Sequence, residues 1–229
     1  MSESTTEIYQ KIHEFRQKYY LNKLIRGSLI FLLLFLSTTF FFVITEGMFW
    51  MGTSARTTIF ALLTISSVLA FGYLAALPLA NLLRFGKVIS DEDAAVLIGQ
   101  HFPEIEDKLL NYLQLSKQSQ ANELLTAAIS QKIDKMRFVP FATAVSFRPN
   151  IRYARYLLIP LLIILIVFVS SPDVITKGTY RLMNFRKPFS PPPPFNILLK
   201  QKNLEVIDGE DFKLDLSVSG KEIPSELYV

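Results

Sequence analysis

The amino-acid sequence predicts a mainly α-helical membrane protein, with three transmembrane helices, a small cytoplasmic helical domain and the start of an external, immunoglobulin-like β-sandwich domain. Half of its 229 residues are apolar and 19% are charged, whereas a soluble chain usually carries about 25% charged residues. The apolar residues are concentrated in three stretches, 24–45, 57–83 and 154–171. Beyond four consecutive prolines, polar and apolar residues alternate, which is typical of strands.

Residues 1–23 are predicted to form a cytoplasmic amphipathic helix. Ser4 and Glu7 have the spacing of a capping box, and apolar side chains recur on one helix face. These apolar side chains are Ile8, Ile12, Phe15 and Tyr19. The helix either runs along the inner membrane surface or packs on the cytoplasmic domain. Its basic residues fit binding to anionic lipid, but the topology of the chain alone also explains them.

The first two apolar stretches are long enough to cross a bilayer. In 24–45, the residues between Arg26 and Glu46 are uncharged, and at ~1.5 Å per residue they cover roughly the 30 Å hydrocarbon core. The second stretch, 57–83, contains no charge and is longer, so it must tilt, kink or project beyond the lipid. Pro78, near its end, is the expected point of departure.

The third apolar stretch, 154–171, has a shorter core, equal to about 21 Å of helix. A snorkelling Arg155 and the terminal Ser170 and Ser171 are needed to complete the crossing. The alternative is a buried core helix. We disfavour it because a chain with two clear spans has no large soluble core in which to bury a third apolar helix.

Lysine and arginine residues near the spans predict the orientation, because cytoplasmic flanks carry an excess of both. Basic residues are frequent before the first span and between the second and third, whereas the loop after the first span has only Arg56. These counts predict an inner-membrane protein with a cytoplasmic amino terminus and a periplasmic carboxy-terminal part. A basic group beyond the third span disagrees, but long exported tails cross largely regardless of charge. Its members are Lys177, Arg181, Arg186 and Lys187.

Residues 88–138 are predicted to form the cytoplasmic helical domain. Ser90 and Asp93 have capping-box spacing at the start of a first helix, and Pro103 separates this helix from a second. A third helix is expected from about Asn122. Roughly 50 residues are too few for a large core, so the domain should lean on the membrane or on a partner.

Acidic residues close to His101 raise the question of a metal site. They are Glu104, Glu106 and Asp107. A metal site needs at least three convergent ligands, whereas a proline followed by acidic residues is the usual composition of a helix amino terminus. We therefore expect no metal and no cofactor. We also find no set of nucleophile, base and orienting group, so we expect no enzymatic activity.

The first two spans contain no ionisable residue of the kind that lines a transport path. The second span does place a small residue at every fourth position. These residues are Gly72, Ala76 and Ala80. Such a face lets another helix approach closely, although the spacing is common by chance. We assign the three residues to helix packing and to no chemistry.

Residues 172–194 are predicted to form an interfacial helix and a proline-rich linker. Ser171 caps the helix and Pro172 takes its first position. A polyproline segment has no internal hydrogen bonds and rises ~3.1 Å per residue, so the linker holds an external domain away from the membrane. The alternative, a proline-rich ligand for a recognition domain, would usually lie in disordered surroundings.

Residues 195–229 are predicted to begin the external β-domain. Apolar residues alternate with polar ones, and Asp208-Gly209 supplies a turn. The alternating apolar residues are Phe212, Leu214, Leu216 and Val218. So few strands cannot bury their apolar face, and their free edge invites pairing. We expect either more strands beyond Val229 or a partner that completes the sheet.

Three segments together resemble a known family. They are HFPEIEDKLLNYLQL after two spans, RPNIRYARYLLIP at the start of a third, and GEDFKLDLSVSG after a proline linker. In this order they resemble the amino-terminal portion of Bacteroidota envelope proteins grouped as domain of unknown function 4175. The resemblance covers most of the chain and implies a longer protein with further external β-domains. Its motifs are structural, so it implies no active residues.

The sequence favours a non-enzymatic inner-membrane scaffold that presents an external β-domain to the cell envelope. The alternative is a subunit of an envelope transport or secretion machine that packs its spans on other subunits. The expected partners are the lipid bilayer and either other proteins or further copies of the chain. No feature indicates nucleic-acid binding.

Overall fold

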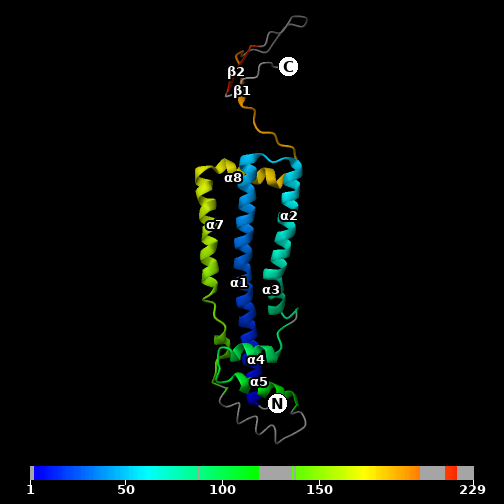
Figure 1. Cartoon of the computed structure of the whole chain (residues 1–229), viewed down its shortest axis with the longest axis vertical. Coiled ribbons are helices and arrows are strands. Elements are labelled where there is room, and N and C mark those ends of the chain that lie inside the picture. The colour runs from blue at the N-terminus through cyan, green and yellow to red at the C-terminus, as the bar shows by residue number, and fades with distance from the viewer. Residues whose placement is uncertain (1–2, 87, 119–135, 137, 202–214, 221–229) are drawn as a thin grey trace. The chain divides into compact units, whose positions relative to one another are not determined.

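The computed structural model of the chain describes residues 3–86, 88–118, 136, 138–201 and 215–220. It divides into two compact units, Met1–Arg186 and Lys187–Val229. In chain order the elements (Figure 1) are α1 (Glu3–Phe49), α2 (Thr53–Phe71), a π-helical turn (Gly72–Ala76), α3 (Leu77–Leu82), α4 (Asp91–Gly99), α5 (Glu106–Gln118), a 3-10 turn (Phe141–Ala144), α7 (Asn150–Ser170), α8 (Pro172–Met183), β1 (Phe195–Leu199) and β2 (Leu216–Gly220).

The longest element is α1, which joins the predicted amphipathic helix 1–23 and the first predicted span 24–45 into one helix of 47 residues. No proline interrupts it, and its apolar amino-terminal face finds a protein partner, so nothing forces a break between the two segments. At ~1.5 Å per residue α1 is roughly 70 Å long. It therefore belongs both to the helical core and to the spans.

The helical core lies where the amino-terminal part of α1 packs against α4, α5 and the 3-10 turn. Ser90 and Asp93 form the predicted capping box, in which the Asp93 N–H donates to Ser90 Oγ over 3.0 Å. The buried side chains include Ile8, Ile12, Phe15, Ala94, Ile98, Leu109, Leu113 and Phe141. The predicted third helix from Asn122 falls mostly outside the described residues, although Met136 is fully buried. The small domain thus packs on α1. Of the two predicted positions for residues 1–23, the structure shows the one in which they pack on this domain.

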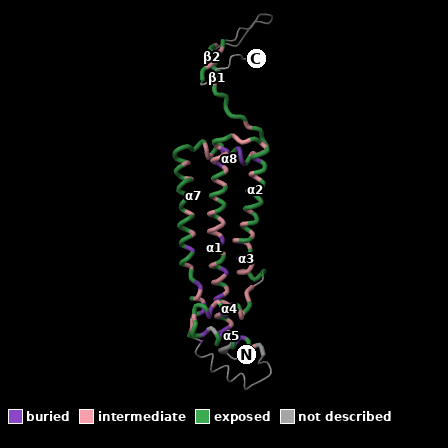
Figure 2. The backbone as a smooth tube through the Cα atoms, viewed as in Figure 1, coloured by how far each residue is buried: buried purple, intermediate pink, exposed green. Residues whose placement is uncertain are grey.

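Three helices within the described residues are long and apolar enough to cross a membrane: Thr6–Phe49, Thr53–Leu82 and Asn150–Ser170. They confirm the prediction of a mainly helical chain with three candidate spans. The first lies between the other two, which contact it but not each other (Figure 1). Only 6% to 11% of the residues in their apolar windows are buried (Figure 2). The spans therefore form an open arrangement whose surface is available to lipid or to other helices.

The second span stays helical past Pro78 and ends at Leu82. The sequence predicted that the span would tilt, kink or leave the lipid at this proline. Proline has no N–H to donate to the carbonyl four residues earlier, which is that of Leu74. The π-helical turn just before the proline absorbs this disruption. The Leu74 carbonyl instead faces Gly27 of α1, where a Cβ atom would lie 1.7 Å from the oxygen. Gly27 thus allows the closest approach of the two spans.

The predicted helix-packing residues lie on the same span but do not make this contact. A Cβ atom at Gly72 would meet nothing within 4 Å, and Ala76 and Ala80 are half-buried. The close contact within this chain instead involves Leu74 and Gly27, on a neighbouring face of the π-helical turn. Packing of Gly72, Ala76 and Ala80 against a helix of another chain stays a prediction.

The second unit contains one described antiparallel pair, in which Phe195 of β1 lies opposite Gly220 of β2 and Leu199 opposite Leu216. Pro191–Pro194 precede β1 and are neither helix nor strand. Phe212, Leu214 and the Asp208-Gly209 turn lie outside the described residues. The described part is thus a two-stranded sheet, and the β-sandwich stays a prediction.

The Gly27 contact can be tested with the same substitution at two glycines. Alanine is normally better than glycine in a helix by about 1 kcal/mol, but at Gly27 its methyl group meets a backbone carbonyl that cannot rotate away. We expect Gly27→Ala to destabilise the chain by about 1–3 kcal/mol and Gly72→Ala to be neutral or stabilising. Thermal unfolding in detergent measures both. Equal stability of the two variants would show that the spans do not meet at Gly27.

Candidate functional site

Charged side chains gather at two places in the first unit, one beyond each end of the apolar part of α1. The first, here called the Glu46 cluster, consists of Glu46, Trp50, Arg56 and Arg181. The second, here called the His13 cavity, is lined mainly by α1 and by the segment from α3 to α4. Tyr20, the cavity residue of α1 nearest to Glu46, lies 26 residues before it, so the two places are about 39 Å apart along the helix.

In the Glu46 cluster one carboxylate lies between two guanidinium groups. Arg181 Nε is 3.3 Å and Arg56 Nε is 3.5 Å from Glu46 Oε1. Glu46 Oε2 accepts a hydrogen bond from the Met51 N–H over 3.2 Å, and Arg56 Nε donates to the Met51 carbonyl over 2.9 Å. The three charged side chains are only 1–3% exposed, so protein rather than lipid buries them.

Arg181 also caps the carboxyl-terminal end of α1. Its Nη2 donates to the carbonyls of Glu46 (2.6 Å) and Gly47 (3.0 Å). These are two of the last four carbonyls of the helix, which have no partner within it, and the positive charge complements the negative end of the helix dipole. One side chain of α8 thus satisfies backbone groups of α1 and pairs with its carboxylate.

Two glycines bring the backbones close enough for this contact. A Cβ atom at Gly178 of α8 would lie 2.3 Å from the Val43 carbonyl oxygen, and one at Gly47 of α1 would lie 2.5 Å from that of Val174. Glycine is a poor helix former, but Gly178 is required here because α8 (Pro172–Met183) packs so closely on α1. The helix begins with Pro172 as predicted, but Ser171 makes no side-chain capping bond.

Trp50 closes the cluster at the turn between α1 and α2. The Arg181 guanidinium lies 3.8 Å from the centre of the indole ring, within cation–π range. Trp50 has φ 50°, a left-handed conformation that costs a non-glycine residue roughly 1–2 kcal/mol. The turn is short because α1 extends to Phe49 and α2 starts at Thr53, well inside the interval predicted between the spans.

Burial lowers the pKa of Arg181, an effect that Glu46 opposes and Arg56 reinforces. Arginine nevertheless stays protonated in proteins, so the group is a permanent buried cation. The carbonyls of Glu46 and Gly47 and the face of the Trp50 ring surround this cation with partial negative charge. The cluster holds α1, α2 and α8 together through buried ion pairs. Its charged side chains are too buried to react with a substrate.

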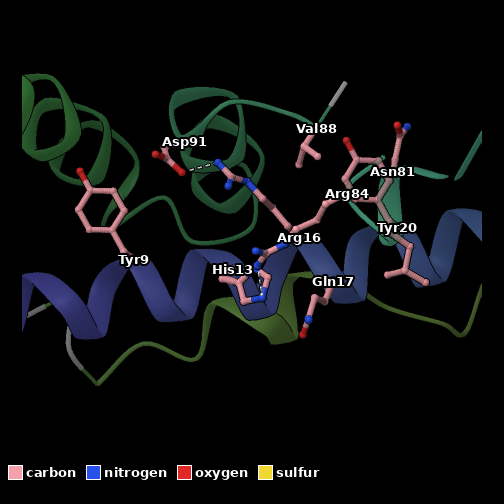
Figure 3. A pocket seen from close by; sticks show the side chains of 10 residues that line it. Tyr9, His13, Arg16, Gln17, Tyr20, Asn81, Arg84, Val88 and Asp91 are labelled. Carbon is pink, nitrogen blue, oxygen red and sulfur yellow. Dashed lines mark hydrogen bonds and ion pairs between the residues drawn. The ribbon is translucent and has the colours of Figure 1, made fainter. Parts of the chain in front are cut away.

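The His13 cavity has a volume of about 400 Å³ and lies beside α1 (Figure 3). From α1 it is lined by Tyr9, His13, Arg16, Gln17 and Tyr20. Asn81, Leu82, Arg84, Val88 and Asp91 complete the wall. These residues supply two arginines, one histidine and one carboxylate, so the cavity is cationic.

The polar contacts inside the cavity leave donors available. Arg16 pairs with Asp91 through Nη2, while its buried Nε has no hydrogen-bond partner (Figure 3). Arg84 Nη2 lies 2.9 Å from His13 Nδ1 and 2.7 Å from its Nε2. The Tyr20 hydroxyl oxygen accepts from the Ile89 N–H, which leaves its hydrogen able to donate. The cavity can bind an anion through these donors, but it contains no nucleophile paired with a base.

Arg84 reaches the cavity from an unusual backbone position. The Phe85 N–H donates to the Ala80 carbonyl (2.8 Å) and the Arg84 N–H to the Asn81 carbonyl (3.2 Å), the two bonds of a Schellman motif. The residue after the helix cap in this motif is usually glycine, because it must be left-handed. Here it is Arg84, with φ 63°. The chain therefore tolerates backbone strain with a cationic side chain at this position.

The sequence identified none of these residues as site residues. Glu46 entered only as the limit of an apolar run, and Arg56 and Arg181 entered only as charges that bear on topology. Their one visible signal is that ionisable residues stand immediately beside the spans, where burial requires a partner. Among the described residues, no three His, Cys, Asp or Glu side chains could hold a metal ion together.

The fold and these two charged places define a mainly helical chain with three candidate membrane spans and a helical core at one end of the first. Comparison of the chain with protein-family models, with curated proteins and with solved structures finds no match. The resemblance to domain of unknown function 4175 therefore stays a prediction.

The contribution of the Glu46 cluster to stability can be tested with a double-mutant cycle. Glu46→Gln removes the buried carboxylate that pairs with Arg56 and Arg181, so we expect a loss of about 3–5 kcal/mol of stability. Arg181→Met removes one of these cations as well as the carbonyl cap. The double variant should lose less than the sum of the two single losses, because the groups interact directly. Thermal unfolding and the fluorescence of Trp50, the single tryptophan, report the change.

A matched control for the cycle is Lys177→Ala on the same helix. Lys177 pairs with Asp173 four residues earlier, but both side chains are more than half exposed. Such a surface pair contributes about 0.5 kcal/mol or less. Strict additivity of the Glu46 and Arg181 losses would show that the two residues do not act as one unit.

Proposed function

We propose that the chain is a non-enzymatic scaffold of the inner membrane, with its amino terminus and helical core in the cytoplasm and residues 187–229 on the periplasmic side. In this function it presents a β-domain to the cell envelope and links that domain to the cytoplasmic core. The main support for this proposal is that α1 is one continuous helix. Its amino-terminal part contributes Ile8, Ile12 and Phe15 to the core. Near its other end, Glu46 pairs with Arg181 of α8. One rigid helix thus connects both ends of the first unit.

Neither charged place in the described part of the chain combines a nucleophile with a base, which favours a scaffold over an enzyme. The Glu46 cluster is closed to solvent, and the His13 cavity contains groups that bind rather than react. The proposed orientation follows the basic residues at the cavity end of the spans. Several of these are tied into the fold there: Arg26 lies 5.3 Å from the ring centre of Tyr153, and Lys18 lies 5.7 Å from that of Phe147.

The open arrangement of the spans favours a second candidate, a subunit of an envelope transport or secretion machine. The second and third spans do not contact each other, and most of their side chains face outward. Such faces accept lipid, further copies of the chain or spans of other subunits. Gly72, Ala76 and Ala80 are the positions at which another helix could approach most closely.

The orientation predicts which introduced cysteines react with a membrane-impermeant thiol reagent. The chain has no cysteine of its own, so each variant has one thiol. Glu104 and Ser190 are both exposed in the fold. In cells with a permeable outer layer, Ser190→Cys should be labelled, whereas Glu104→Cys should be labelled only after the inner membrane is disrupted. The opposite labelling pattern would contradict the proposed orientation.

Partner capture distinguishes the scaffold from the machine subunit. The scaffold binds partners through its carboxy-terminal unit, so a chain that lacks residues 187–229 should lose them on affinity purification in mild detergent. Gly72→Leu, which adds bulk to an outward face, should leave the partner set unchanged. Quantitative mass spectrometry of the purified material measures both. Loss of partners with Gly72→Leu, and retention without residues 187–229, would favour the machine subunit instead.

A further inference from the structure

We propose that the His13 cavity binds a phosphate group, the chemistry shared by anionic phospholipid headgroups and free phosphate. Three observations carry this inference: the balance of charge in the cavity, its unused donors, and the backbone conformation of Arg84. None of them depends on the scaffold function or on the orientation of the chain.

The charge of the cavity is positive and only partly balanced. Asp91 is its one carboxylate, and Arg16 already pairs with it. The Arg84 guanidinium has no acidic partner in the described part of the chain and lies against the His13 ring. Two cations held near one another without a second carboxylate repel each other, and a bound anion relieves this repulsion.

The donors around the cavity are of the kind that binds a phosphate group. Phosphate presents several acceptor oxygens, and arginine supplies planar, fork-shaped donors that match them. The buried Nε of Arg16 lacks an acceptor, Arg84 meets only imidazole nitrogens, and Tyr20 has a hydroxyl hydrogen to donate. A volume of about 400 Å³ has room for a phosphate group with its ester substituents.

Arg84 shows the backbone strain that accompanies a functional constraint. At the left-handed position after a helix cap, glycine or asparagine removes most of the strain, yet an arginine is present. Its position is also just beyond an apolar helix, since Leu82 ends the second candidate span and Phe85 is 86% exposed. If that span crosses a bilayer, a headgroup phosphate in the cavity would lie close to the lipid border.

The variant that tests this inference is Arg84→Asn, because asparagine tolerates the left-handed conformation while removing the charge. The unliganded variant should be at least as stable as the natural chain. Loss of one charge-assisted contact should weaken binding at least about tenfold. Lys23→Gln is the matched control, since Lys23 is an exposed cation of α1 near the same membrane border but outside the cavity.

Two probes distinguish the sources of the phosphate. In the first arm, native mass spectrometry counts the lipids retained by the full chain from mixed phosphatidylglycerol and phosphatidylcholine. In the second, inorganic phosphate is titrated in detergent at constant ionic strength, and the melting temperature is followed. Selective retention of phosphatidylglycerol identifies a lipid headgroup, and a saturable thermal shift with phosphate identifies a free anion. Either result supports the site if Arg84→Asn abolishes it and Lys23→Gln does not.

Three results would overturn the proposal. The first is the absence of both selective lipid retention and a saturable phosphate shift in the natural chain. The second is an equal loss in Arg84→Asn and Lys23→Gln, which would reduce the effect to the general attraction between a basic border and anions. His13→Gln adds a second cavity variant, and unchanged binding in both cavity variants would likewise exclude the His13 cavity.

Discussion

The contact between Arg181 and the end of α1 is the interaction on which the first unit depends. A helix that ends at a membrane border leaves carbonyls without partners, and a carboxylate buried there needs a cation. Arg181 supplies both the donor and the cation. It donates to the carbonyls of Glu46 and Gly47, and it pairs with the Glu46 side chain. Through Arg56 the same carboxylate holds the start of α2. The three helices that meet at this border are therefore fixed by one shared charge.

The opposite end of α1 is held by a different force. There the apolar face of α1 is buried against α4 and α5, and burial of this face contributes most of the stability that so small a helical domain can obtain. Polar contacts add direction, as in the bond of 2.6 Å from Asn150 Nδ2 to Asn22 Oδ1 at the start of α7. The first unit thus combines an ionic lock at one border with an apolar core at the other.

The sequence predicted the elements whose signals are local. Uncharged runs located the spans, Ser90 and Asp93 located the start of α4, and the period of Ile8, Ile12 and Phe15 identified the buried face of α1. The site residues were not predictable in the same way, because Glu46, Arg56 and Arg181 meet only after three helices are placed. Gly178 illustrates the limit: in the sequence it weakens a helix, and in the fold it permits the close crossing of α8 over α1. Pairings between distant residues leave no periodic trace in a single sequence.

The continuity of α1 has a mechanical consequence. A transmembrane helix adjusts its tilt when the thickness of the bilayer changes. In this chain the tilting helix is also part of the helical core, so the core cannot keep its position while the span leans. Because α1 extends about 36 Å on the core side of Gly27, a small change of angle becomes a displacement of several ångströms at its amino terminus. In a bilayer, a change in lipid thickness that tilts this helix would therefore also move the helical core.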